Sequence, residues 1–336
     1  MTDGSIYKLD WSRVNLRGGV VTVVVIVAVA VVLVFFGTLG IAVGLATLFV
    51  MIADTPGSLR SRLIAVLTFS FIGALLAFGG AWTGSEKPLL ASLLMAAVVY
   101  LATIAAARGK PAAVRWLLLS IWVVMVISLS SGVERPAELS LAFLGGGLLA
   151  GIGISVLGWL ADDDEEGDRP LPMSVVLAEI GTPLGRFALI RGLAAGVATY
   201  LGVLLFPDFP VWVVIAVLIV LREERGATID IGVLRTLGTL LGVAVASGVL
   251  LVLGEDELAV IAAFLFSGFV MIAFQKVNYA VFSLFLTALL VFALHVSGED
   301  ALEGGIARLL ATLLGVAIAF GGILVTTSGR SSTQSS

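Results

Sequence analysis

The chain has 336 residues, of which 60% are hydrophobic and 12% charged, and its formal net charge is -4. Average soluble domains have roughly 25% charged residues, so this composition indicates a polytopic membrane protein whose first partner is the lipid bilayer. Lys and Arg are scattered singly, which excludes a nucleic-acid-binding patch. The chain has no cysteine and one histidine, which excludes disulfides and Cys or His metal clusters. It also lacks a Walker-type phosphate loop, and we expect no cofactor.

Apolar runs divide the chain into spans. A spanning helix needs about 20 apolar residues, and on that criterion we predict an all-α protein of about twelve transmembrane helices in two six-helix halves. The runs of the first half lie at 19–36, 39–53, 63–80, 88–107, 113–130 and 138–160. Those of the second half lie at 187–206, 211–221, 235–253, 258–275, 279–296 and 306–326.

The segments outside the spans are polar. We predict a cytoplasmic N-terminal segment at 1–18, a first half at 19–160, an acidic, Pro-containing cytoplasmic linker at 161–186, a second half at 187–327 and a disordered cytoplasmic tail at 328–336. With the N-terminus inside, only Lys87, Arg135 and Arg308 of the 19 Lys and Arg residues fall on the outer side. This positive-inside bias predicts a multi-pass protein of the plasma (inner) membrane with both termini cytoplasmic.

One motif occurs twice in the second half. Residues 235–246 read RTLGTLLGVAVA and residues 308–319 read RLLATLLGVAIA, so in each copy a Thr follows the Arg by four residues and a Gly by seven. On a helix these positions share one face. The copies begin helices three spans apart, which predicts opposite directions and an inverted repeat. Chance similarity between two small-residue helices is the alternative. Between the halves, Arg62 aligns with Arg235.

The two motif arginines are the first candidates for a substrate pathway. Arg235 is predicted to open its helix at the cytoplasmic face, where its guanidinium and the Thr239 hydroxyl suit a carboxylate. Arg308, followed by Thr312, is predicted one turn inside the outer end of the last helix. The arginines would then mark opposite ends of a path. Snorkelling of Arg308 toward Glu299, Asp300 or Glu303 is the alternative.

Two further stretches are candidates for the same pathway. The run at 211–221, which contains Trp212, is too short to span a bilayer alone, as is its counterpart at 39–53; interrupted helices at matching positions often line a transport site. Residues flanking 211–221 could instead complete the span. Lys276 and Tyr279 precede the 279–296 helix, whose Ser283 and Thr287 continue a polar stripe. Such a stripe faces either a pathway or a packed neighbour.

The remaining candidates have simpler roles. Gly238, Gly242 and Gly315 are expected to permit close helix packing. Asp230 is the carboxylate nearest to a span, and His295 titrates near neutral pH, so both are candidates for a proton-linked role. A structural role for His295 is the alternative. The spans contain no buried carboxylate relay.

The second half resembles the FUSC family, the fusaric acid resistance and aromatic acid exporter-like proteins, over about residues 187–325. The resemblance is carried by Trp212 in its short run, the charged loop from Arg222, RTLGTLLG from Arg235, NYAVFSLFLTALL from Asn278 and RLLATLLG from Arg308. It implies an inner-membrane permease that exports small, often aromatic, carboxylic acids, driven by an ion gradient. The large cytoplasmic domains of bigger family members are missing here.

We therefore expect a secondary transporter that exports small organic, aromatic carboxylate-like anions. A non-transporting membrane scaffold or assembly subunit and a passive anion channel are the alternatives, and a homo-oligomer or an accessory subunit would fit the glycine steps. No nucleophile and base pair or metal constellation is visible, so we expect no enzymatic activity.

Overall fold

The computed structural model describes residues 11–54, 57–130, 135–160, 174, 178, 181–207, 209–253 and 256–331. These residues form eleven α-helices and a short 3-10 turn, and no strand occurs among them. The all-α prediction is confirmed. Eight of the helices are long and apolar enough to cross a membrane, so the protein is a multi-pass membrane protein, although twelve spans and a two-half layout are not confirmed.

The first predicted half forms helices α1 to α5. Their bounds are Leu16–Ala53 (α1), Leu59–Thr83 (α2), Pro88–Ala106 (α3), Lys110–Leu129 (α4) and Pro136–Leu160 (α5). The separate spans predicted at 19–36 and 39–53 are wrong, because α1 is one helix of 38 residues. Its two central glycines, Gly37 and Gly40, each disfavour a helix by only about 1 kcal/mol relative to Ala, and no proline ends it there.

The second predicted half forms helices α7 to α12. Their bounds are Pro183–Leu205 (α7), Val211–Val220 (α8), Arg225–Leu253 (α9), Glu257–Ala273 (α10), Tyr279–Val296 (α11) and Ala301–Ser331 (α12). The short run is a short helix, since ten residues make α8 about 15 Å long. The alternative in which Leu221 to Thr228 extends it is wrong, because α9 already begins at Arg225.

The predicted linker and tail lie largely outside the described residues. Of residues 161–186, the structure describes 174, 178 and 181–186. Helix α12 continues to Ser331, within the predicted tail of 328–336, and residues 332–336 are not described. The polar residues Thr326 to Ser331 extend the helix, and Thr326 Oγ1 donates to Gly322 O at 2.9 Å.

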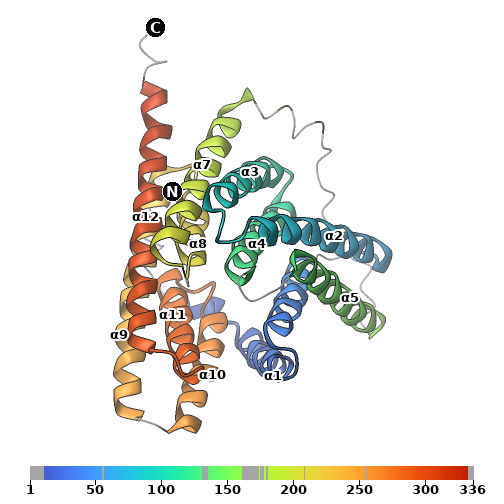
Figure 1. The fold of residues 1–336 in the computed structure, drawn as a ribbon, viewed down its shortest axis with the longest axis vertical. Helices are drawn as coiled ribbons and strands as arrows, with labels where there is room; N and C mark the ends of the chain where they lie inside the picture. Colours follow the sequence, from blue (N-terminus) through green and yellow to red (C-terminus); the bar gives the residue numbers. More distant parts are fainter. Residues whose placement is uncertain are drawn as a thin grey trace. The chain divides into compact units, whose positions relative to one another are not determined.

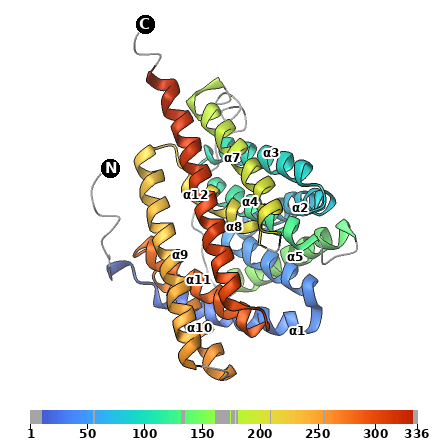
Figure 2. The ribbon, with the colours of Figure 1, turned by 60° about the vertical axis from the view of Figure 1, so that its left-hand side comes forward.

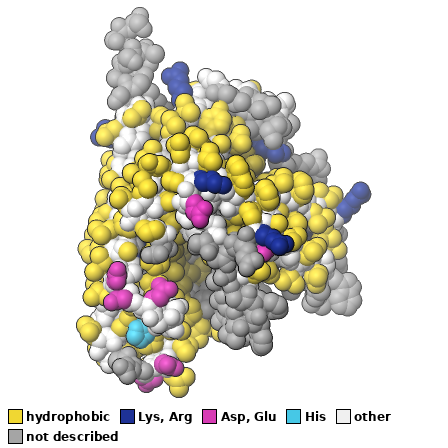
Figure 3. Space-filling view, in the orientation of Figure 1, with side chains coloured by type: hydrophobic (Ala, Val, Ile, Leu, Met, Phe, Trp, Pro, Cys, Tyr) yellow, Lys and Arg dark blue, Asp and Glu magenta, His cyan; other side chains and the backbone are white. Residues whose placement is uncertain are grey.

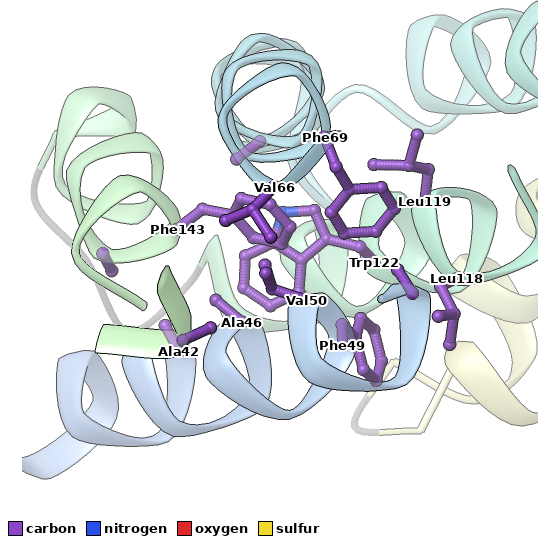
Figure 4. Close-up of a cluster of buried hydrophobic side chains, with 14 of the residues drawn as sticks. Ala42, Ala46, Phe49, Val50, Val66, Phe69, Leu118, Leu119, Trp122 and Phe143 are labelled. Atoms are coloured by element: carbon purple, nitrogen blue, oxygen red, sulfur yellow. The ribbon is translucent and has the colours of Figure 1, made fainter. Parts of the chain in front are cut away.

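Residues 31–214 form one compact unit, whose core is aromatic. Trp122 of α4 is fully buried and lies 4.7 Å from Phe143 of α5 and 6.3 Å from Phe49 of α1, measured between ring centroids (Figure 4). Within this unit α7 packs along α3, and a Cβ on Gly192 would lie 2.7 Å from the Ala96 carbonyl oxygen. The sequence assigns α7 to the second half, and that division stays a prediction.

Residues 1–30 and 215–336 form the other unit, which contains the bundle α9 to α12. Helices α9 and α12 run side by side, with α11 packed against both (Figures 1 and 2). The α9–α12 pair is antiparallel, because Gly232 meets Phe320 whereas Gly305 meets Val243. The two motif copies therefore run in opposite directions on neighbouring helices, as predicted, while their origin as an inverted repeat stays a prediction.

Small residues bring α9 against α11. A Cβ built on Gly238 would lie 2.6 Å from the Ala280 carbonyl oxygen, and one on Gly242 would lie 2.5 Å from that of Leu284. Only glycine permits this approach, because real Cβ atoms do not come so close to backbone oxygens. From the first contact to the second, both helices advance by four residues in the same direction, so α9 and α11 are parallel. These close contacts fix which residues of the two helices face each other.

Candidate anion-binding site

Arg235 lies in the interior of the bundle. Helix α9 begins at Arg225, so Arg235 lies about three turns inside it and does not open it as predicted. Its relative exposure is 0%. The guanidinium Nη1 donates to the hydroxyl of Tyr279 at 3.3 Å, and among the described residues Nε and Nη2 have no hydrogen-bond partner.

The polar stripe of α11 faces these groups. The side chain of Asn278 accepts hydrogen bonds from the first backbone N–H groups of α11 and so starts the helix immediately before Tyr279. Ser283, one turn on, donates to the carbonyl of Arg235 at 3.3 Å and lies 3.4 Å from the Thr239 hydroxyl. Thr287, another turn on, is also fully buried. The stripe is thus packed against protein and not exposed to lipid.

Arg308 and Thr312 of α12 complete a cluster of buried and half-buried polar side chains. Its other members are Arg235, Thr239, Tyr279, Ser283 and Thr287. Arg308 is 3% exposed, and its Nε donates to Thr287 Oγ1 at 3.3 Å. Thr312 lies one turn further along α12 and is fully buried. Its hydroxyl has no hydrogen-bond partner in the part of the chain that the structure describes. A buried hydroxyl without a partner costs about 1–3 kcal/mol. A bound ligand that accepted a hydrogen bond from Thr312 would remove this cost.

The placement of the two arginines at opposite ends of a path is wrong. They belong to one cluster, because Arg235 contacts Tyr279 and Ser283 and Arg308 contacts Thr287 along the same stripe of α11. The predicted helices were too short. Helix α12 begins at Ala301, which places Arg308 about two turns inside it, and the antiparallel overlap with α9 brings both arginines to the middle of the bundle.

The cluster is electrostatically unfavourable as it stands. Taking an ion out of water costs several kcal/mol unless a counter-charge and hydrogen bonds compensate. The described residues give Arg235 no carboxylate, and its guanidinium donates to a neutral hydroxyl. The two guanidinium groups and the neighbouring hydroxyls are hydrogen-bond donors of the kind that binds a carboxylate or another oxyanion. Binding such an anion is the chemistry that this arrangement supports.

Arg62 of α2 shows the opposite situation. The sequence aligns it with Arg235, yet Arg62 forms an ion pair with Asp54, at the end of α1. The two side chains are 18% and 13% exposed. Arg62 thus has its counter-charge within the chain. Of these two aligned arginines, only Arg235 is buried without one among the described residues.

The hydrogen bonds of the cluster do not involve the predicted pathway residues Lys276 and Trp212 or the predicted packing residue Gly315. Lys276 is exposed in the turn before α11, next to the half-buried Tyr279. Trp212 lies in the first turn of α8 and belongs to the unit of residues 31–214. Gly315 is buried on α12.

The two proton-linked candidates lie on α11 and α9. His295 is exposed in the last turn of α11, two turns beyond Thr287. Asp230 lies on α9 five residues before Arg235. The two positions are therefore about 140° apart around the helix axis.

Sequence reasoning did not single out one further arginine, the exposed Arg222. It lies in the loop between α8 and α9, close enough to Tyr279 for the two groups to interact electrostatically. The buried Thr228 fixes this loop, since its hydroxyl bonds the backbone of Arg222 and the carbonyl of Glu224 at 3.0–3.1 Å. Nothing in the composition of the charged loop that begins at Arg222 distinguishes Arg222 from Arg225.

Every residue of the cluster lies within the segment of the chain that matches a known protein family. Residues 187–322 match the fusaric acid resistance protein-like family. This part of the chain is similar to that family. The match begins within α7 and ends in α12, so the fusaric acid resistance protein-like region contains both motif copies and the α11 stripe. Comparison with the curated proteins and with the solved structures finds no match.

Proposed function

We propose that the protein is a secondary transporter that exports small organic carboxylate anions and binds them at the Arg235–Arg308 cluster. The observation that carries the proposal is Arg235, fully buried, with two guanidinium nitrogens that have no partner among the described residues. An anion would supply the missing counter-charge. An aromatic carboxylate is the preferred substrate, in line with the fusaric acid resistance protein-like family to which residues 187–322 are similar.

The charge at the far end of the bundle supports export. Asp256 and Glu257 at the start of α10 and Glu299, Asp300 and Glu303 around the start of α12 are all exposed. Acidic side chains gather around His295 in the surface view (Figure 3). If this end faces outward, as the positive-inside pattern predicts, its negative potential disfavours return of a released anion.

The surface of the bundle is compatible with lipid. Hydrophobic side chains cover the face formed by α9 and α12 (Figure 3). Leu237, Leu240 and Leu241 of α9 are each about half exposed, on the side away from Arg235. An apolar outer face and a polar inner face are what a helix lining a path through a bilayer requires.

The test is transport by the purified full-length protein in liposomes. Uptake of radiolabelled 4-hydroxybenzoate is measured at a pH well above the pKa of its carboxyl group, and leakage into protein-free liposomes is subtracted. We expect Arg235→Gln and Arg308→Gln to lower apparent affinity or rate about 10- to 100-fold, because each removes charged hydrogen bonds to the anion.

Arg225→Gln is the matched control. Arg225 is an exposed arginine in the first turn of the same helix, and we expect near-normal transport from this variant. Wild-type transport by both cluster variants would refute the site. No protein-dependent flux of any organic anion would refute the transporter and favour the scaffold.

A further inference from the structure

We infer that a substrate carboxylate docks side-on to Arg235, with one oxygen on Nε and the other on Nη2, and that Tyr279 is the positioning residue that orients the guanidinium for this contact. The inference rests on the proposed function and deepens it, because it names the chemical group that the site recognises. It follows from which nitrogens of Arg235 are bonded within the bundle.

Arg235 has one of its three guanidinium nitrogens engaged. Nη1 donates to the hydroxyl of Tyr279 at 3.3 Å, whereas the buried Nε and Nη2 have no hydrogen-bond partner among the described residues. A guanidinium offers two forks to an acceptor with two oxygens, one formed by Nε and Nη2 and the other by Nη1 and Nη2. The Nε–Nη2 fork is therefore the one that can accept a carboxylate while the contact with Tyr279 is kept.

The backbones of α9 and α11 meet beside Tyr279. A Cβ on Gly238 would lie 2.6 Å from the carbonyl oxygen of Ala280, the residue that follows Tyr279. Ser283, one turn on, donates to the carbonyl oxygen of Arg235 at 3.3 Å. These two contacts fix the backbone of Tyr279 relative to that of Arg235.

The ring of Tyr279 is held as well. It lies 5.9 Å from the ring of Phe282, measured between centroids, at an interplanar angle of 34°. With its ring and backbone in place, the Tyr279 hydroxyl gives Nη1 one fixed acceptor. This contact selects one orientation of the guanidinium from the several that the long arginine side chain can adopt.

Burial makes the Nε–Nη2 fork selective. Both nitrogens are shielded from solvent, so water does not complete a hydrogen bond that a ligand leaves unmade. A carboxylate satisfies the two nitrogens with its two oxygens, whereas a phenolate has a single oxygen to share between them. We therefore expect the site to recognise the carboxylate group of its substrate and to reject aromatic anions that carry one oxygen.

The test compares two anions that have the same ring and differ in the charged group. Pentafluorobenzoate and pentafluorophenolate compete with radiolabelled 4-hydroxybenzoate for uptake into liposomes that contain the full-length protein, at a pH at which both are ionised. The ratio of their inhibitory concentrations does not depend on how much of the protein is active. For the wild type we expect pentafluorobenzoate to inhibit at a concentration about tenfold lower or less, and tenfold corresponds to about 1.4 kcal/mol.

Two variants test the residues. Tyr279→Phe keeps the ring beside Phe282 and removes the hydroxyl, so the ratio should fall several-fold because Nη1 no longer has its fixed acceptor. Arg235→Lys replaces the fork by a single nitrogen, so the ratio should fall toward one. Tyr200→Phe and Arg225→Lys are the matched controls, because Tyr200 is 39% exposed on α7 and Arg225 is exposed in the first turn of α9. Both controls should keep the wild-type ratio.

The outcomes are distinguishable. A wild-type ratio near one would refute the two-point fork, and an unchanged ratio in Tyr279→Phe would refute the positioning role of Tyr279. No protein-dependent uptake would refute the proposed function alone. The ratio is then measured from the rise in unfolding temperature that each anion causes in the purified protein, and the same tenfold difference is expected. No stabilisation by either anion would refute the inference as well.

Discussion

Replacing Arg235 with methionine separates binding from stability. Methionine has a similar length and no charge, so it fills the same space beside α11 without an uncompensated cation. The wild-type side chain is fully buried, and its guanidinium donates a hydrogen bond to the neutral hydroxyl of Tyr279. We expect transport to be lost while the folded protein loses no more than about 1 kcal/mol of stability.

The magnitude follows from two opposing contributions. Replacing buried charged groups by well-packed apolar ones is neutral or stabilising by about 1–4 kcal/mol. Loss of the hydrogen bond to Tyr279 costs about 1 kcal/mol. The free energy of unfolding without anion should therefore change by roughly -1 to +3 kcal/mol, whereas most core substitutions lower it by more.

The assay is thermal unfolding of the purified protein in detergent, without added organic anion. Arg62→Met is the matched control, because it leaves the Asp54 carboxylate, only 13% exposed, without its ion-pair partner. That variant should lose about 1–3 kcal/mol. If Arg235→Met destabilises the protein as much as Arg62→Met does, Arg235 is a structural residue and the anion-site reasoning is refuted.

Three other predictions test the cluster and its packing. Thr312→Val keeps the shape of a fully buried side chain and removes a hydroxyl without a described partner, so thermal stability should hold or rise by about 1 kcal/mol, whereas the apparent affinity for 4-hydroxybenzoate should fall several-fold; a normal affinity would exclude Thr312 from the site. Gly242→Ala places a Cβ 2.5 Å from the Leu284 carbonyl oxygen and should lower the free energy of unfolding by about 1–3 kcal/mol, while Gly248→Ala, where nothing lies within 4 Å, should raise it by up to about 1 kcal/mol; equal effects would contradict the α9–α11 approach. An organic anion at 100 times its Kd should stabilise the wild type by about 2.7 kcal/mol and so raise its unfolding temperature, whereas the unfolding temperature of Arg235→Met should not change. An equal shift in both proteins would mean that the anion binds elsewhere.

Local sequence patterns predicted the helices well where hydropathy changes sharply. The 279–296 run has the same bounds as α11, because a polar turn with the capping Asn278 precedes it and a glycine turn at Gly298 follows it. The first two spans merge into α1 because glycine weakens a helix without ending it. Helices α9 and α12 extend beyond their apolar runs, since polar residues continue a helix that tertiary contacts already hold.

By itself, the sequence determined that this is an all-helical membrane protein, that Arg235 and Arg308 follow one pattern, and that Ser283 and Thr287 continue a polar stripe. These are properties of composition and of helical spacing. Only the tertiary structure decided that these residues meet, because the depth of each arginine depends on where its helix begins and on the antiparallel overlap of α9 with α12. Hydropathy places a residue along the membrane normal to within a few turns, whereas a binding site requires the arginines and hydroxyls of three helices to lie at the same level.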